Sequence, residues 1–143
     1  MKLAAAVGVL LLAVAAALWL AWRQGFVGEA ALPGPLPAFQ AHLLARGIDT
    51  VAQPVRRDLA EVQAHVHFKV LRSDGQVFFV LWCNSPEAAQ RHLKRLQAAP
   101  SPSLPEANGS LVIYLTDWKA EEPLTRKVLE AFRSFDAARH ASM

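Results

Sequence analysis

A long uncharged run near the N-terminus constrains this chain more than any other feature. From Leu3 to Trp22 the sequence contains only Leu, Ala, Val, one Gly and two Trp. A helix of roughly twenty residues is about 30 Å long, which matches the hydrocarbon thickness of a bilayer. Trp19, Trp22 and Arg23 end the run with the aromatic and basic side chains typical of a membrane interface. The sequence therefore predicts a transmembrane anchor at residues 1–23.

A cleaved signal peptide is the alternative to a retained anchor. Signal peptides have a shorter apolar core, of about 7–15 residues, followed by a cleavage site between small residues. Gly28-Glu29-Ala30 and Ala15-Ala16-Ala17 both fit such a site. The length of the run and the bulky Trp at its end favour the anchor. An apolar surface on all sides also suits lipid better than the interior of a soluble domain.

The charges that flank the run indicate an orientation. Lys2 and the α-amino group precede it, whereas Arg23 and then Glu29 follow it. The positive-inside rule favours, by about one charge, an N-terminus in the cytoplasm and a domain outside it. Abundant Ala and Leu, and Arg twice as frequent as Lys, are typical of a GC-rich bacterium. The predicted location is therefore the inner membrane, single-pass, with a periplasmic or otherwise extracytoplasmic domain.

The overall charge argues against nucleic acid as a partner. The chain has 15 basic and 12 acidic residues, and two of the basic ones, Lys2 and Arg23, flank the apolar run. The remainder is nearly neutral, whereas nucleic-acid binding needs clustered Lys and Arg. Cys83 is the only cysteine, so no internal disulfide can form.

The rest of the chain divides into a Gly/Pro-rich spacer at 24–36, a folded domain at 37–136 and a tail at 137–143. The domain pattern predicts helices at 37–46, 86–99 and 123–139 and strands at 49–55, 61–70, 77–83 and 111–116. A crossover from the 77–83 strand through helix 86–99 into the 111–116 strand would make some of the pairing parallel. We therefore expect an α+β, two-layer domain: a mixed sheet of about four strands with helices mainly on one face.

Two strands of this sheet form a predicted hairpin. Residues 61–70 alternate between apolar and polar, and Asp74-Gly75 is a strong turn signal. Residues 77–83 are apolar throughout, which is typical of a strand covered on both faces. A two-residue turn would place Val66 opposite Cys83 and His67 opposite Trp82. One side of the hairpin would then carry His65, His67, Lys69, Leu71, Phe78, Val80 and Trp82.

This mixed aromatic, aliphatic and basic face is the candidate binding surface, because exposed apolar patches usually mark interaction sites. The alternative is that a helix, for example 37–46, covers it and makes it a second small core. Helix 86–99 carries a basic run of Arg91, His92, Lys94 and Arg95, which is expected to be an ordinary solvated face with a Glu87–Arg91 surface pair.

His65 and His67 share one face of a strand and are the candidate metal ligands. A metal site needs at least a third ligand, and among the predicted neighbours only Glu61 is a good one. Cys83 would point to the opposite face, away from both histidines, which argues against a Cys-His nucleophile pair. No phosphate-binding loop or nucleophile elbow is present. We therefore expect neither catalysis nor a cofactor.

These observations favour a membrane-tethered, non-catalytic interaction or accessory module with a protein partner at the membrane. The alternative function is a small-ligand or metal-binding domain that uses the His65/His67 face.

Overall fold

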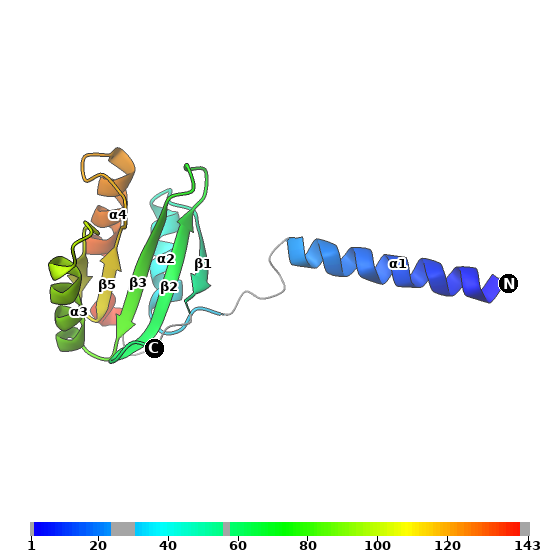
Figure 1. The fold of residues 1–143 in the computed structure, drawn as a ribbon, viewed down its shortest axis with the longest axis horizontal. Coiled ribbons are helices and arrows are strands. Elements are labelled where there is room, and N and C mark those ends of the chain that lie inside the picture. The colour runs from blue at the N-terminus through cyan, green and yellow to red at the C-terminus, as the bar shows by residue number, and fades with distance from the viewer. Residues whose placement is uncertain (1, 24–30, 56–57, 141–143) are drawn as a thin grey trace. The chain divides into compact units, whose positions relative to one another are not determined.

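The computed structural model describes residues 2–23, 31–55 and 58–140, with the side chains of the first helix described for residues 5–19. The chain divides into two compact units, Met1–Ala31 and Leu32–Met143. The first contains the single helix α1, Lys2–Arg23 (Figure 1). Its described side chains are all exposed, among them Trp19 at 55%.

No helix in the part of the chain that the structure describes is both long and apolar enough to cross a membrane. The predicted transmembrane anchor at 1–23 is therefore not supported by this structure. The side chains of Trp22 and Arg23, predicted at the interface, lie outside the described residues, as do residues 24–30 of the predicted spacer. Residues 32–36 belong to the folded unit, where Leu36 is fully buried.

The folded unit is an α+β domain built on a five-stranded sheet with the order β1-β2-β3-β5-β4. The strands are β1 Thr50–Pro54, β2 Val62–Val70, β3 Val77–Cys83, β4 Glu106–Asn108 and β5 Leu111–Tyr114. All neighbouring strands pair antiparallel, so the predicted mixed sheet of about four strands is wrong.

The short strand β4 explains that error. A crossover does leave β3 through helix α3, Pro86–Ala98, but it leads to β4 and not to β5. A tight turn at Gly109, whose φ is +57°, then brings β5 back between β3 and β4. Strand β4 consequently runs parallel to β3 without pairing with it, because both are antiparallel to β5.

Local chemistry predicts where the helices begin, and it predicts the end of α2 but not the end of α4. Helix α2, Leu36–Ala45, has Pro37 in its first turn, and Gly47 follows its end with a φ of +78°. The chain then folds back, since Ile48 N–H donates to Leu43 O at 2.9 Å and the Ile48 side chain is only 1% exposed. Helix α4, Pro123–Ser134, ends earlier than predicted and is followed by the short helix α5, Ala137–His140.

The main core lies between one face of the sheet and helices α2 and α4. Phe39 of α2 makes edge-to-face contacts with Phe68 of β2, at 5.8 Å between ring centroids, and with Phe132 of α4, at 5.9 Å. Ala137, in the predicted tail, is 2% exposed and belongs to this core. Figure 1 shows α2 behind β1 and β2, and α3 near β5. A second, smaller core under α3 lies on the opposite face of the sheet.

The β2–β3 hairpin has a different register from the predicted one. Val66 lies opposite Val80 and His67 opposite Phe79, three residues from their predicted partners along β3. The connection is a five-residue loop, 71–75, closed by a 2.9 Å hydrogen bond from Val70 N–H to Gln76 O. An odd shift exchanges the two faces of a strand, because successive side chains point to opposite sides.

A substitution at Gly34 tests the packing of Trp82 against this residue. Its φ is +58°, and a Cβ there would lie 2.5 Å from the Trp82 ring. We expect Gly34→Ala to lose about 1–2 kcal/mol from left-handed strain and a further ~1–3 kcal/mol from overpacking. Urea unfolding of the full chain in non-ionic detergent, followed by far-UV circular dichroism, measures the loss.

Gly75→Ala is the matched control. Gly75 has a similar φ of +79°, but a Cβ there meets nothing within 4 Å. Only the strain of about 1–2 kcal/mol should appear. Equal losses in the two variants would show that Trp82 does not pack against Gly34.

Candidate functional site

The observed register divides the predicted binding face between the two sides of the sheet. Phe78 and Val80 are 0% exposed and lie in the main core, and Trp82 packs against that core beside Gly34. These three assignments to an open face are therefore wrong. Helix 36–45 does cover a face of the hairpin, as the alternative prediction had it, but this is the face without the histidines.

His65, His67 and Lys69 lie on the opposite side, together with Phe79 of β3 and Tyr114 of β5. The rings of this group contact one another closely. Phe79 stacks on Tyr114, with centroids 4.9 Å apart and planes at 12°. The two imidazoles lie against Phe79 at 5.5 and 5.3 Å. We call His65, His67, Phe79 and Tyr114 the ring cluster.

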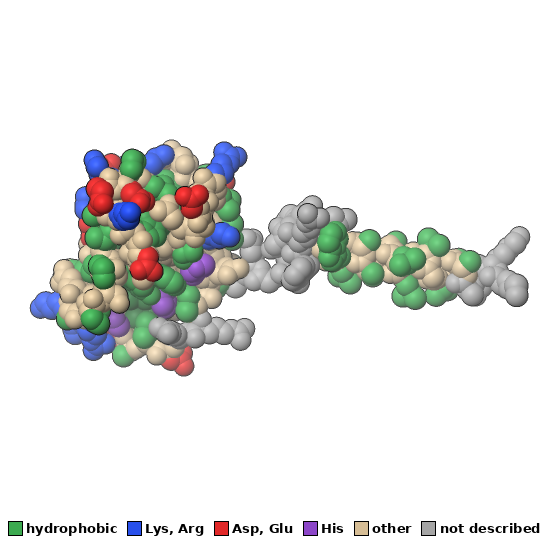
Figure 2. Space-filling view, turned by 45° about the horizontal axis from the view of Figure 1, so that its top comes forward, with side chains coloured by type: hydrophobic (Ala, Val, Ile, Leu, Met, Phe, Trp, Pro, Cys, Tyr) green, Lys and Arg blue, Asp and Glu red, His purple; other side chains and the backbone are tan. Residues whose placement is uncertain are grey.

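The two histidines have different environments within this cluster. His65 is 6% exposed, so its predicted place on an exposed face is also wrong, and its Nε2 is 2.7 Å from the Tyr114 hydroxyl. His67 is partly exposed and Lys69 is exposed. Burial therefore decreases along β2 from His65 to Lys69, in the direction away from α3. Figure 2 shows histidine side chains among hydrophobic ones on the surface of the domain.

Helix α3 covers only the other part of this face. It packs Ala88 and Ala89 against Leu81, Cys83 and Val112. Its main contacts with the sheet are with β3, β4 and β5, and Val62 at the start of β2 also packs against this core. The part formed by β1, β2 and the first half of β3 has no comparable helix over it among the described elements. We call this uncovered part, with Val51, His67, Lys69, Val77 and Phe79, the open half-face.

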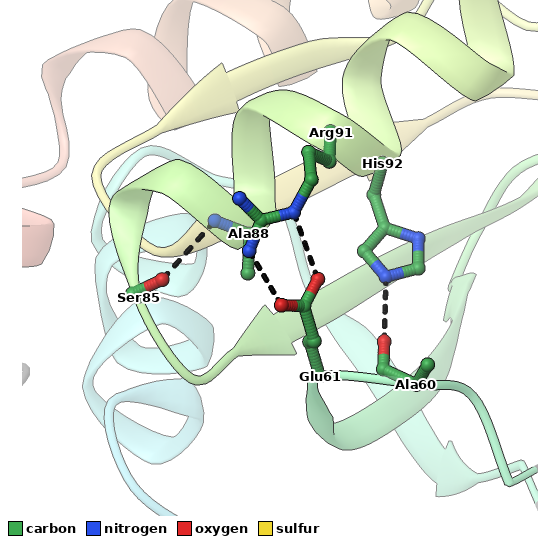
Figure 3. Close-up of polar contacts among 6 residues, drawn as sticks. All are labelled: Ala60, Glu61, Ser85, Ala88, Arg91 and His92. Carbon is green, nitrogen blue, oxygen red and sulfur yellow. Dashed lines mark hydrogen bonds and ion pairs between the residues drawn. The ribbon is translucent and has the colours of Figure 1, made fainter.

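Polar contacts fix α3 in place (Figure 3). Ser85 caps the helix, since its Oγ accepts from Ala88 N–H at 3.1 Å. Arg91 forms a two-point ion pair with Glu61, at 2.9 and 2.5 Å, and not with Glu87. The Arg91 guanidinium lowers the pKa of the Glu61 carboxyl through this hydrogen bond. His92, predicted on a solvated face, is instead buried, with Nε2 2.9 Å from Ala60 O.

Cys83 lies on the same face of the sheet as the histidines, so its predicted separation from them is wrong. It is 1% exposed beneath α3. Burial, and secondarily the Glu61 carboxylate, raise the pKa of the Cys83 thiol to about 11. A thiol with such a pKa is a poor nucleophile at neutral pH, since the thiolate is the reactive form.

The metal-ligand candidates, His65 and His67, do share a face as predicted. In residues 2–23, 31–55 and 58–140, however, no group of three or more His, Cys, Asp or Glu side chains is placed to hold a metal ion. Nε2 of His65 faces the Tyr114 hydroxyl, and the His65 ring packs on Phe79.

Phe79 and Tyr114 are the members of the ring cluster that the sequence does not identify. Phe79 lies in a strand that is apolar on both sides, so alternation cannot assign it to a face. Tyr114 reaches the cluster only because β5 pairs with β3, and no local signal predicts that pairing.

Comparisons of the chain with protein-family models, with curated proteins and with solved structures find no match.

The environment of Cys83 predicts low reactivity in the native state. At pH 8 a thiol of pKa about 11 is ionised to about one part in a thousand, and α3 also blocks access. We expect reaction with an aromatic disulfide reagent to be slow in the native full chain and fast in urea. As a control, the double variant Cys83→Ala/Asn84→Cys carries its thiol at an exposed neighbouring position. Equally fast native reaction of both chains would contradict the buried, high-pKa thiol.

Proposed function

We propose that this chain is a non-catalytic interaction module, held at a membrane by α1, that binds a protein partner through the open half-face of its sheet. One observation carries the proposal: α3 covers one part of this face and leaves the part with Phe79, His67 and Lys69 without a helix. The other face of the sheet packs against α2 and α4 in the main core.

The chemistry of the open half-face supports a protein partner. Aromatic side chains are enriched in interfaces because they bury a large area and lose few rotamers. Phe79 and Tyr114 are partly exposed and rigidly stacked, so little entropy remains to be lost on binding. Lys69 adds an exposed charge beside them, where a polar rim is expected.

Three side chains of kinds that often take part in catalysis make structural contacts here. The Cys83 thiol is buried under α3 with a raised pKa. The Arg91 guanidinium is bound to Glu61, and His92 to a backbone carbonyl. These contacts support a binding role over a catalytic one.

The membrane part of the proposal comes from the sequence. The apolar run from Leu3 to Trp22 has interfacial residues at its end, and flanking charges favour a domain outside the cytoplasm. The described apolar side chains of α1 are exposed, among them Leu12 at 73% and Val9 at 68%, which supports an interaction of α1 with an apolar surface.

Photo-crosslinking tests the interaction surface. A photoreactive amino acid replaces Lys69, an exposed residue of the open half-face, in the full chain in its native cells. We expect a discrete cross-linked species, because a partner bound there lies within reach of the probe. Gel mobility and mass spectrometry identify it.

The same probe at Lys94, which is exposed on α3, is the matched control. It should give no such species, because α3 lies over the other part of the sheet. Identical patterns at the two positions, or no cross-link at residue 69, would contradict the proposal.

A reporter fused after Met143 tests the membrane arrangement. A reporter active only outside the cytoplasm should be active, and the chain should stay in the membrane fraction after an alkaline wash. Release by the wash would show that α1 is not an anchor, and activity only of a cytoplasmic reporter would reverse the orientation.

A further inference from the structure

A cleft of about 430 Å³ lies at the end of the sheet away from α3. The β2–β3 loop and the segment after β5 form its walls, and it continues from the open half-face through His67, Val77 and Phe79. Its lining residues are His67, Asp74, Gly75, Gln76, Val77, Phe79, Thr116, Asp117 and Trp118.

Aromatic rings form the side of the cleft nearest the sheet. His67 and Phe79 both line it and contact each other at 5.3 Å between centroids. Tyr114 stacks behind Phe79, which fixes the orientation of the Phe79 ring. Trp118 is only 9% exposed and packs in the main core against Phe78, with its Nε1 donating to Val77 O at 2.8 Å, so it supports the cleft from below. His67 and Phe79 are the partly exposed rings of the cleft, and their contacts position them before any ligand arrives.

Two carboxylates lie at the same cleft. Asp74 is in the β2–β3 loop and Asp117 follows β5, and both are exposed. Neither takes part in an ion pair or side-chain hydrogen bond within the described part of the chain. Asp117 also has a φ of +65°, a left-handed conformation uncommon for a residue other than glycine. The cleft thus combines negative charge with ring faces.

We propose that this cleft binds an arginine side chain of the protein partner, and this inference rests on the proposed function of the open half-face. A guanidinium is planar and always charged, so it can stack on an aromatic ring while donating hydrogen bonds to a carboxylate. The cleft offers both kinds of group together, which is the charge complementarity that selects this occupant.

A lysine side chain or a metal ion fits this combination of rings and carboxylates less well than an arginine does. A lysine ammonium is a point charge that cannot stack on a ring as a planar group does. A metal ion would need three or more ligating side chains, and the described residues hold no such group. Lys69 of β2 and Arg72 of the β2–β3 loop form no ion pair with Asp74 or Asp117 in the part of the chain described.

Titration with a short peptide tests the proposal. The full chain, isotopically labelled in non-ionic detergent, is titrated with acetyl-Gly-Arg-Gly-Arg-Gly-amide and followed by NMR signals of residues 76–79 and 117. We expect saturable changes in chemical shift. The dissociation constant should be at least about tenfold larger for the Asp74→Asn/Asp117→Asn variant. Phe79→Leu should weaken binding by about fivefold through loss of the ring.

Asp58→Asn is the matched control, because it removes one exposed carboxylate outside the cleft. It should bind the peptide like the unaltered chain, and the peptide with Lys in place of Arg should bind more weakly. Absence of saturable shifts overturns the inference. Equal weakening by Asp58→Asn, or equal affinity for the Lys peptide, also overturns it, because either shows binding by net charge alone.

Failure here is distinguishable from failure of the proposed function. The cross-link at residue 69 is repeated in the Asp74→Asn/Asp117→Asn chain. If it persists while the peptide fails to bind, the open half-face binds a partner without an arginine in the cleft. If it never forms in the unaltered chain, the interaction surface itself is wrong.

Discussion

The register of the β2–β3 hairpin determines most of what this domain presents to its surroundings. It is set by a five-residue loop in which the Ser73 hydroxyl donates to Val70 O at 2.8 Å and accepts from Gln76 N–H at 3.3 Å. Because β3 is apolar along its whole length, the loop alone decides which of its side chains face α2 and α4. Phe78 and Val80 enter the main core, and Phe79 is left beside the histidines. The ring cluster forms because this register places Phe79 on the same side as the histidines.

Local signals in the sequence predict the helices and strands well, but they do not predict the register of the β2–β3 hairpin. The alternation in 62–70, the Ser85 cap and the Gly47 termination each act within a few residues, and the structure contains all three. The side of the sheet on which Phe79 lies depends instead on the length of the β2–β3 loop. Asp74-Gly75 favours a two-residue turn. The structure has a longer loop instead, stabilised by the Ser73 hydroxyl and containing Arg72 in a left-handed conformation. The shared side of His65, His67 and Lys69 is therefore confirmed, and the placement of Phe78, Val80 and Trp82 beside them is wrong. Binding at this face stays a prediction.

The strand order also could not be predicted from local signals in the sequence. A helix between two apolar strands is typical of a parallel crossover, but β4 is only three residues long and has no apolar alternation that would reveal it. Once β4 takes the edge position, β5 must return antiparallel between it and β3. Helix α3 then lies mainly over β3, β5 and β4, the half of the sheet away from β1. The open half-face follows from that displacement, since a single helix cannot cover five strands.

The His-x-His pair shows how position on this sheet separates two identical side chains. His65 lies opposite Leu81, a member of the second core, so it is buried and its Nε2 meets the Tyr114 hydroxyl. His67, one pleat further from α3, lies opposite Phe79 and lines the cleft. A metal would have to draw both imidazoles to one point, which would break the His65–Tyr114 contact and the packing of both rings on Phe79. In the observed arrangement His65 orders the ring cluster and His67 remains available at its edge, so the pair suits a preformed binding surface better than a pair of metal ligands.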